Sequence, residues 1–192
     1  IQKLTNFHQT PHWRVKSFYQ RLHARILEKR ENRKHMDTLK KHRIDTLDLI
    51  VCNLYPFEET IKKEKVGMDE VIENIDIGGP TLIRSAAKNY KDVIIVTNKN
   101  QYDLVLKSLK EKGNMSVSER EKLAIEAYTH TAQYDTIISN YIRKRWTNDF
   151  LPDTQTITMR KKQDMRYGEN PHLKGAFYKE IPETKEPCIT NA

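Results

Sequence analysis

The sequence has no apolar run that approaches the about 18 residues needed to cross a bilayer, so we expect no transmembrane helix. It has only two cysteines, Cys52 and Cys188, too few for a disulfide framework or a zinc knuckle. It begins with Ile1, and its first residues have the pattern of neither a signal peptide nor a transit peptide. These absences favour a reducing, cytoplasmic setting.

Apolar residues are also scarce, at 37% of the 192 residues, which predicts a modest hydrophobic core. Short apolar runs such as residues 93–97 nevertheless recur, and they argue against a long disordered chain. At about 100–200 residues per domain, the length allows one domain, or one domain and a piece of another. No set of side chains has convincing metal-ligand spacing, because His8 and His12 form only an incidental pair. We therefore expect no metal.

Acidic residues are few at the start of the chain. Residues 1–50 contain 12 Lys and Arg but 5 Asp and Glu, which gives +7 of the total net charge of +8. Such a basic block could attract nucleic acid or a phosphorylated small molecule. It could equally be the solvated face of a helix, and the composition leaves these readings open.

Apolar runs at about residues 48–54 and 93–97 predict two buried strands. Strands that alternate with helices favour an α/β domain with these two strands parallel. The predicted helices lie at about 21–42, within 57–74, at 81–89, from Asn100 or Asp103 to Gly113, and from Ser116 or Ser118 to about Trp146, with Ser118–Glu121 as a capping box.

The composition shifts after Trp146. Prolines at 152, 171, 182 and 187 interrupt the remaining chain, which predicts a loop-rich C-terminal segment. Because this segment is short, we expect residues 148–192 to form no independent core.

Two places in the chain suit a ligand. Residues 53–57 directly follow a predicted strand, and residues 76–81 directly precede a predicted helix, the positions where α/β proteins bind ligands. Gly78 and Gly79 allow close approach of the backbone, and Lys88 lies on that helix. Each feature alone has a simple structural explanation, such as a helix-entry turn or a surface lysine. Their combination favours a binding site.

Several ordered motifs resemble the bifunctional PurH family of purine biosynthesis, over about residues 14–178. In that family an IMP cyclohydrolase domain precedes an AICAR transformylase domain. The motifs are Asn-Leu-Tyr-Pro-Phe-Glu at 53–58, Glu-Asn-Ile-Asp-Ile-Gly-Gly-Pro at 73–80, Arg-Ser-Ala-Ala-Lys-Asn at 84–89, Thr-His-Thr-Ala-Gln-Tyr-Asp at 129–135 and Met-Arg-Tyr-Gly-Glu-Asn-Pro-His at 165–172.

The resemblance implies a division of the chain. Residues 1–147 would be a partial IMP cyclohydrolase domain, and residues 148–192 would be a linker and the beginning of the transformylase domain. The implied fold is α/β, a three-layer parallel-sheet domain of the methylglyoxal-synthase-like type without its N-terminal strand. The family also implies a homodimer in the cytoplasm, with no membrane or nucleic-acid partner.

The implied reaction is the dehydrative ring closure of formyl-AICAR, a phosphoribosyl aminoimidazole nucleotide, to IMP without a cofactor. The resemblance assigns Asp76 as base or proton relay, Lys88 and Tyr55 as oxyanion donors, and Lys16 as a fourth catalytic residue. A close Lys88–Asp76 pair would keep both side chains charged. The implied substrate-binding residues are Arg14, Ser17, Asn53, Gly78, Gly79, Arg166 and Tyr167. The transformylase would use 10-formyltetrahydrofolate as cosubstrate, and we expect no transformylase activity from this chain.

The sequence departs from the family pattern near its start. The motif at residues 13–20 is altered, Arg25 stands where the family has a small residue, and the family extends upstream of Ile1. These departures predict weak capture of the substrate phosphate. Two alternatives follow: a catalytically impaired or inactive remnant of the family, and a basic nucleic-acid-binding module that uses residues 1–43.

Overall fold

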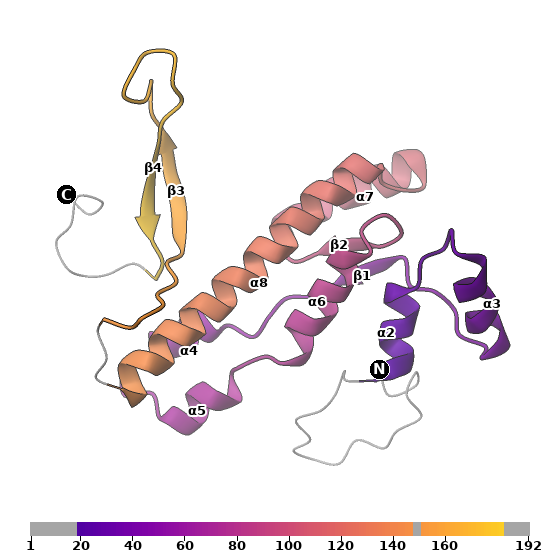
Figure 1. Cartoon of the computed structure of the whole chain (residues 1–192), viewed down its shortest axis with the longest axis horizontal. Helices are drawn as coiled ribbons and strands as arrows, with labels where there is room; N and C mark the ends of the chain where they lie inside the picture. Colours follow the sequence, from indigo (N-terminus) through magenta and orange to yellow (C-terminus); the bar gives the residue numbers. More distant parts are fainter. Residues whose placement is uncertain (1–18, 148–150, 183–192) are drawn as a thin grey trace.

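A computed structural model describes residues 19–147 and 151–182. Within them the chain is a mixed α/β structure in which helices predominate and the sheets are small (Figure 1). In chain order, the elements are α2 (Gln20–Leu27), α3 (Arg33–Lys41), β1 (Leu49–Val51), α4 (Phe57–Ile61), α5 (Met68–Glu73), α6 (Gly78–Lys88), β2 (Ile94–Val96), the 3₁₀ turn η1 (Lys99–Gln101), α7 (Tyr102–Lys112), α8 (Val117–Trp146), β3 (Met159–Asp164) and β4 (Ala176–Glu180).

The first sheet consists of β1 and β2, which pair in parallel, with Ile50 opposite Ile95. The predicted parallel pairing of the two apolar runs is therefore confirmed, although each strand is three residues long. α6 lies in the connection between the two strands and packs against both. The helix begins at Gly78, three residues before its predicted start.

Burial differs between the two strands. β2 is buried along its whole length, as predicted. In β1, Leu49 is 37% and Val51 52% exposed, so the prediction that this strand is buried is wrong for these two residues. In the described part of the chain β1 has one strand neighbour, whereas buried parallel strands have covered faces. Its apolar sequence alone could not distinguish the two situations.

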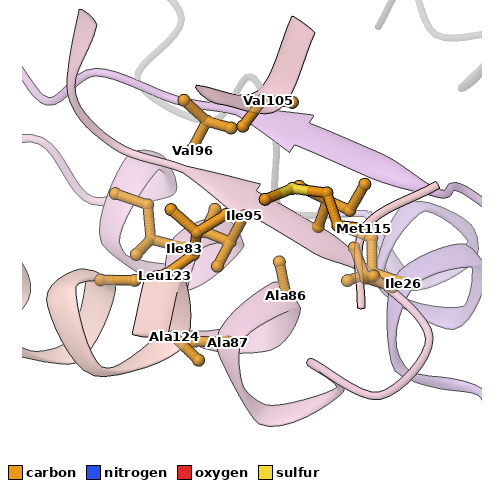
Figure 2. Packing of buried hydrophobic residues seen from close by; sticks show 13 residues of the cluster. Ile26, Ile83, Ala86, Ala87, Ile95, Val96, Val105, Met115, Leu123 and Ala124 are labelled. Carbon is orange, nitrogen blue, oxygen red and sulfur yellow. The ribbon is translucent and has the colours of Figure 1, made fainter. Parts of the chain in front are cut away.

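The main core gathers around β2. Ile83 and Ala86 of α6 and Leu123 of α8 pack with Ile95, and Val105 of α7 belongs to the same cluster. Figure 2 shows Val105 with Val96 on one side of the β2 ribbon and the α6 and α8 side chains on the other. The strand is thus enclosed by three helices that follow one another closely in the chain.

The first basic stretch forms two helices instead of the single one predicted over residues 21–42. α2 ends at Leu27 and α3 begins at Arg33. The side chain of Asn32 accepts hydrogen bonds from the backbone N–H groups of Lys34 (3.1 Å) and His35 (3.4 Å). This N-cap starts a new helix, a signal that the charged composition concealed.

The ends of α7 and α8 follow local rules. α7 ends at Gly113, as predicted, in a left-handed conformation (φ 70°) that favours glycine. Ser116 caps α8: its hydroxyl accepts from the Glu119 N–H, and the Glu119 carboxylate accepts from the Ser116 N–H at 2.7 Å. The capping box therefore spans Ser116–Glu119, and the prediction of a box at Ser118–Glu121 is wrong.

The C-terminal segment contains an antiparallel hairpin of β3 and β4, which the sequence did not predict. The other described residues of this segment, 151–158, 165–175 and 181–182, lie outside helices and strands, in agreement with the predicted loop-rich segment. Every residue of β3 is exposed, and Figure 1 shows the hairpin extending away from the helices. Its charged sequence lacks the alternation that normally reveals a strand. After the hairpin, Ile181 is buried against Phe57, Val71 and Tyr134 in a second cluster built mainly from the preceding helices.

No helix in the described ranges is both long enough and apolar enough to cross a membrane.

Replacing Ser116 with Ala should remove an acid-sensitive contribution to stability. Hydrogen bonds from Ser116 lower the pKa of the Glu119 carboxyl group from 4.5 to about 2. Because the folded state favours the ionised form, the contribution is present above the unfolded-state pKa of 4.5 and is lost as the pH falls towards 2. Thermal unfolding should show that Ser116→Ala is less stable than the parent at pH 7 and that the difference narrows in acid. Ser118→Ala is the matched control, and parallel pH curves for Ser116→Ala and the parent would contradict the assignment.

Candidate active site

A pocket of about 440 Å³ lies at the carboxyl ends of the two parallel strands. Residues 53–59 line it after β1, and residues 97–99 line it after β2. One face of α8 completes the wall. The size suits a small organic ligand, and the position is the one at which α/β sheets bind ligands. The other lining residues are Lys62, directly after α4, and His130, Gln133, Tyr134 and Ile137 of α8.

The start of α6 is held by its own preceding carboxylate. One side-chain oxygen of Asp76, Oδ1, accepts a hydrogen bond from the Gly79 N–H at 2.8 Å. Gly79 is buried, and a Cβ atom at that position would lie 2.5 Å from Asp76 Oδ2 and 2.7 Å from Leu54 Cδ2. Any side chain at this position would therefore require Asp76 or Leu54 to shift.

Cys52, at the end of β1, contacts the same turn. Its sulfur lies 3.8 Å from the Gly79 carbonyl oxygen, to which the thiol donates. Burial raises the pKa of the Cys52 thiol to about 11, and the nearby charge of Asp76 contributes in the same direction. The thiol consequently stays protonated near neutral pH and acts as a packing and hydrogen-bonding group, not as a nucleophile.

Tyr134 of α8 joins this turn to the pocket. Its hydroxyl accepts from the Asp76 backbone N–H at 2.8 Å and donates to the Asn74 carbonyl oxygen at 3.2 Å, while the residue also lines the pocket. Burial raises the pKa of the Tyr134 hydroxyl, with smaller contributions from the charges of Asp76, Asp135 and Tyr55. Asp76 is thus hydrogen-bonded to a buried tyrosine that lines the pocket together with Tyr55.

The structure brings together part of the predicted site. Asn53 and Tyr55 line the pocket, and Tyr55 is 47% exposed. Asp76 and Gly79 lie directly behind Leu54 and Tyr134, which both line it. The Asn53 amide also lies at hydrogen-bond distance, 3.5 Å, from the Tyr102 hydroxyl, which ties the strand end to α7.

Lys88 lies elsewhere. It is the exposed last residue of α6, whereas Asp76 precedes the first, and 11 helical residues separate the two ends by about 16 Å. The described ion pairs include none between them. The predicted close Lys88–Asp76 pair is therefore wrong, because three turns of regular helix lie between the residues. The catalytic assignment of Lys88 rests on the resemblance alone.

Other predicted site residues either lie away from the pocket or fall outside the residues that the structure describes. Arg166 and Tyr167 are exposed in the connection between β3 and β4, and neither lines the pocket. Arg14, Lys16 and Ser17 lie outside the described residues. Their predicted contacts with the substrate phosphate therefore stay predictions.

Part of the basic block is used within the fold. Arg30 pairs with Asp48 at 2.6 Å and donates to the Leu47 carbonyl oxygen at 2.9 Å. Arg25 donates to the Asp45 carbonyl oxygen at 2.6 Å. These contacts join α2 and the turn after it to the chain leading into β1, so these two cations have a structural use.

The sequence motif at residues 129–135 contains three residues that line the pocket and were not predicted from the sequence to do so. His130, Gln133 and Tyr134 share one face of α8 because they are spaced by three and four residues. Burial lowers the pKa of the His130 imidazole below its usual 6.5, so this ring is neutral at pH 7. The spacing itself was a usable signal, since residues three and four apart lie on the same face of a helix. The described residues include no cluster of three or more metal-binding side chains.

Gly79→Ala should damage both the fold and the site. The added methyl group would have to displace Asp76 or Leu54, so we expect a loss of about 1–3 kcal/mol of unfolding free energy. Gly67→Ala is the matched control, because its Cβ would meet nothing within 4 Å. Denaturant titration of both variants tests the prediction, and equal stabilities would contradict the close packing around Gly79.

Comparison with known proteins finds two families that match successive parts of the chain. Residues 86–192 match the AICARFT/IMPCHase bienzyme family, and residues 1–81 match the MGS-like domain. The chain is 47% identical over 192 residues to the bifunctional purine biosynthesis protein PurH of Acetivibrio thermocellus, covering 100% of this chain and 37% of that protein. The protein of the same name from Listeria monocytogenes is 44% identical over 192 residues, with the same two coverages.

One solved structure has a fold similar to that of this chain. The structure titled "Crystal structure of ForH" has a TM-score of 0.64 and 26% sequence identity, covering 75% of this chain and 76% of that one. The chain spans 37% of the length of the two curated relatives described above. Because this family model matches more than half of its residues, the chain belongs to the AICARFT/IMPCHase bienzyme family.

Proposed function

We propose that this chain carries the IMP cyclohydrolase site of the family, which closes formyl-AICAR to IMP with loss of water. The observation that carries the proposal is that Tyr55 lines a pocket of about 440 Å³ together with Tyr134, whose hydroxyl accepts from the Asp76 backbone N–H. Family membership supplies the reaction, and this geometry supplies groups of the required chemistry. The proposal extends to the three-layer fold of the methylglyoxal-synthase-like type for residues 1–147.

The reaction needs little chemical machinery because both partners are in one molecule. The carboxamide nitrogen attacks the formyl carbon and a C–N bond forms. The C–O bond of the former formyl group then breaks, and its oxygen leaves as water with one proton from the carboxamide nitrogen and one from the formamide nitrogen. Holding one rotamer of the substrate supplies much of the acceleration. The remaining needs are a group that takes the amide proton and donors that stabilise the developing oxyanion.

The described residues can meet both needs. Asp76 Oδ1 holds the start of α6, so we assign the amide proton to its second oxygen. Tyr55, half-exposed at the pocket, donates to the oxyanion. Asn53 orients the aminoimidazole base of the substrate. Because the Gly79 N–H already donates to Asp76, we assign the backbone contact with the substrate to Gly78.

Other parts of the proposal follow from the family. Arg14, Lys16 and Ser17 would hold the substrate phosphate. Residues 148–192 would link to a transformylase region that uses 10-formyltetrahydrofolate, with Arg166 and Tyr167 in its nucleotide-contacting loop. We propose a cytoplasmic homodimer for the whole protein and no transformylase activity for this chain.

The position of Lys88 favours a second candidate, an impaired member of the family. A lysine about 16 Å along α6 from Asp76 could not share an oxyanion with it in this arrangement. Turnover by the parent chain separates the two readings, and Lys88→Met then tests whether Lys88 takes part in catalysis. If the chain turns over and Lys88→Met lowers the rate of IMP formation at least tenfold, the residue reaches the site; if the rate is unchanged, catalysis proceeds without it. No turnover by the parent would support the impaired reading.

Asp76→Asn should lower the kcat of ring closure by about 10²–10⁴-fold, the usual size of a general-base contribution. The amide oxygen can still accept from the Gly79 N–H, so the fold should persist. Absorbance of the product gives the rate, and circular dichroism checks the fold. Asp69→Asn, on the exposed first turn of α5, is the control and should keep the parent rate. A fully active, folded Asp76→Asn would exclude Asp76 as the base.

A further inference from the structure

Tyr134 contacts two segments that lie far from it in the sequence, the turn before α6 and the start of α4. Its hydroxyl makes two hydrogen bonds to the backbone of the turn before α6, with Asn74 and Asp76, which lie 60 and 58 residues earlier in the chain. Its side chain is 7% exposed, so water competes little for these bonds. The two bonds use the hydroxyl once as donor and once as acceptor.

The ring of Tyr134 contacts the second segment, the start of α4. It meets the ring of Phe57 edge to face, with centroids 6.2 Å apart, and Phe57 is buried at the start of α4. The Phe57 N–H donates to the Tyr55 carbonyl oxygen at 2.8 Å. The position of Tyr55 at the pocket is therefore linked through Phe57 to Tyr134 on α8.

The hydroxyl has to be neutral to work in this way. A tyrosinate could accept from the Asp76 N–H but could not donate to the Asn74 carbonyl oxygen. Burial raises the pKa of Tyr134, which keeps the proton on the hydroxyl throughout the neutral range. The side chain thus provides a fixed pair of bonds and no proton-transfer step.

We propose that Tyr134 is a positioning residue that fixes the Asp76 carboxylate, which lies behind the pocket wall, relative to Tyr55, which lines the pocket. The inference rests on the proposed cyclohydrolase function for its catalytic meaning. Asp76 is then anchored twice, at its backbone by Tyr134 and at its side chain by Gly79. Without the hydroxyl, the turn keeps its sequence but loses the bonds that set its distance from α8.

The test compares two tyrosines that contact the same phenylalanine. Tyr134→Phe keeps the edge contact with Phe57 and removes the hydroxyl. Tyr141 also meets Phe57 edge to face, at 6.0 Å, so Tyr141→Phe is the matched control. We expect Tyr134→Phe to lower the kcat of ring closure about 10–100-fold, as small misplacements of reacting groups do, with KM within about twofold of the parent. Tyr141→Phe should match the parent in both constants.

A second readout does not depend on turnover. Amide hydrogen exchange followed by NMR should show at least tenfold faster exchange at Asp76 and Gly79 in Tyr134→Phe, and parent rates in Tyr141→Phe. If the parent forms no IMP, the proposed function fails and this exchange measurement alone decides whether Tyr134 fixes the turn. Equal exchange in the two variants would overturn the inference. So would equal kcat values in an active chain, even with the proposed function intact.

Discussion

The burial of β2 is the constraint on which the rest of this arrangement depends. Three consecutive apolar residues leave no polar face, so the strand requires cover on both sides. α6 and α8 provide it on one side, and Val105 of α7 on the other. Because the first helix immediately precedes the strand and the others follow it, the cover forms largely from neighbouring parts of the chain. The start of α6 and the middle of α8 are placed as a consequence.

α8 carries this constraint from the core to the site. Leu123 and Ala127 near its start belong to the cluster around β2, whereas Tyr134 and Ile137 belong to the second cluster. His130 lies between the two sets and lines the pocket. A single rigid helix therefore joins both clusters, and the polar residues between its apolar contacts are held against the ends of the strands.

Sequence reasoning succeeds here where one local rule acts without competition. Gly113 ends α7, and the apolar run at 93–97 forms a buried strand, because each signal is contained in a few adjacent residues. It fails where long-range packing decides the outcome. The exposure of Val51 depends on which strands flank β1, and the hairpin of β3 and β4 depends on backbone pairing between polar strands.

The candidate site divides in the same way. The positions of Tyr55 and Asp76 follow from strand and helix ends, which sequence motifs locate well. The separation of Lys88 follows from the uninterrupted helix between it and Asp76, which motif matching does not consider. The part played by Tyr134 depends on contacts across about 60 residues, so its motif could be noticed in the sequence while its use could not.

The proposed ring closure depends more on catalytic side chains that are held in place than on catalytic side chains whose pKa values are strongly shifted. In an intramolecular ring closure the reacting atoms arrive together, so the largest gain comes from holding one arrangement. Asp76 supplies an oxygen whose partner oxygen is tied to the backbone of α6, and Tyr134 ties the same residue to α8. The contacts that stabilise the junction between the strand and the two helices are thus the contacts that would orient the substrate. A displacement of Asp76 would lower the rate of ring closure before it unfolded the chain. The reason is that the turn before α6, which contains Asp76, is not part of the buried cluster around β2.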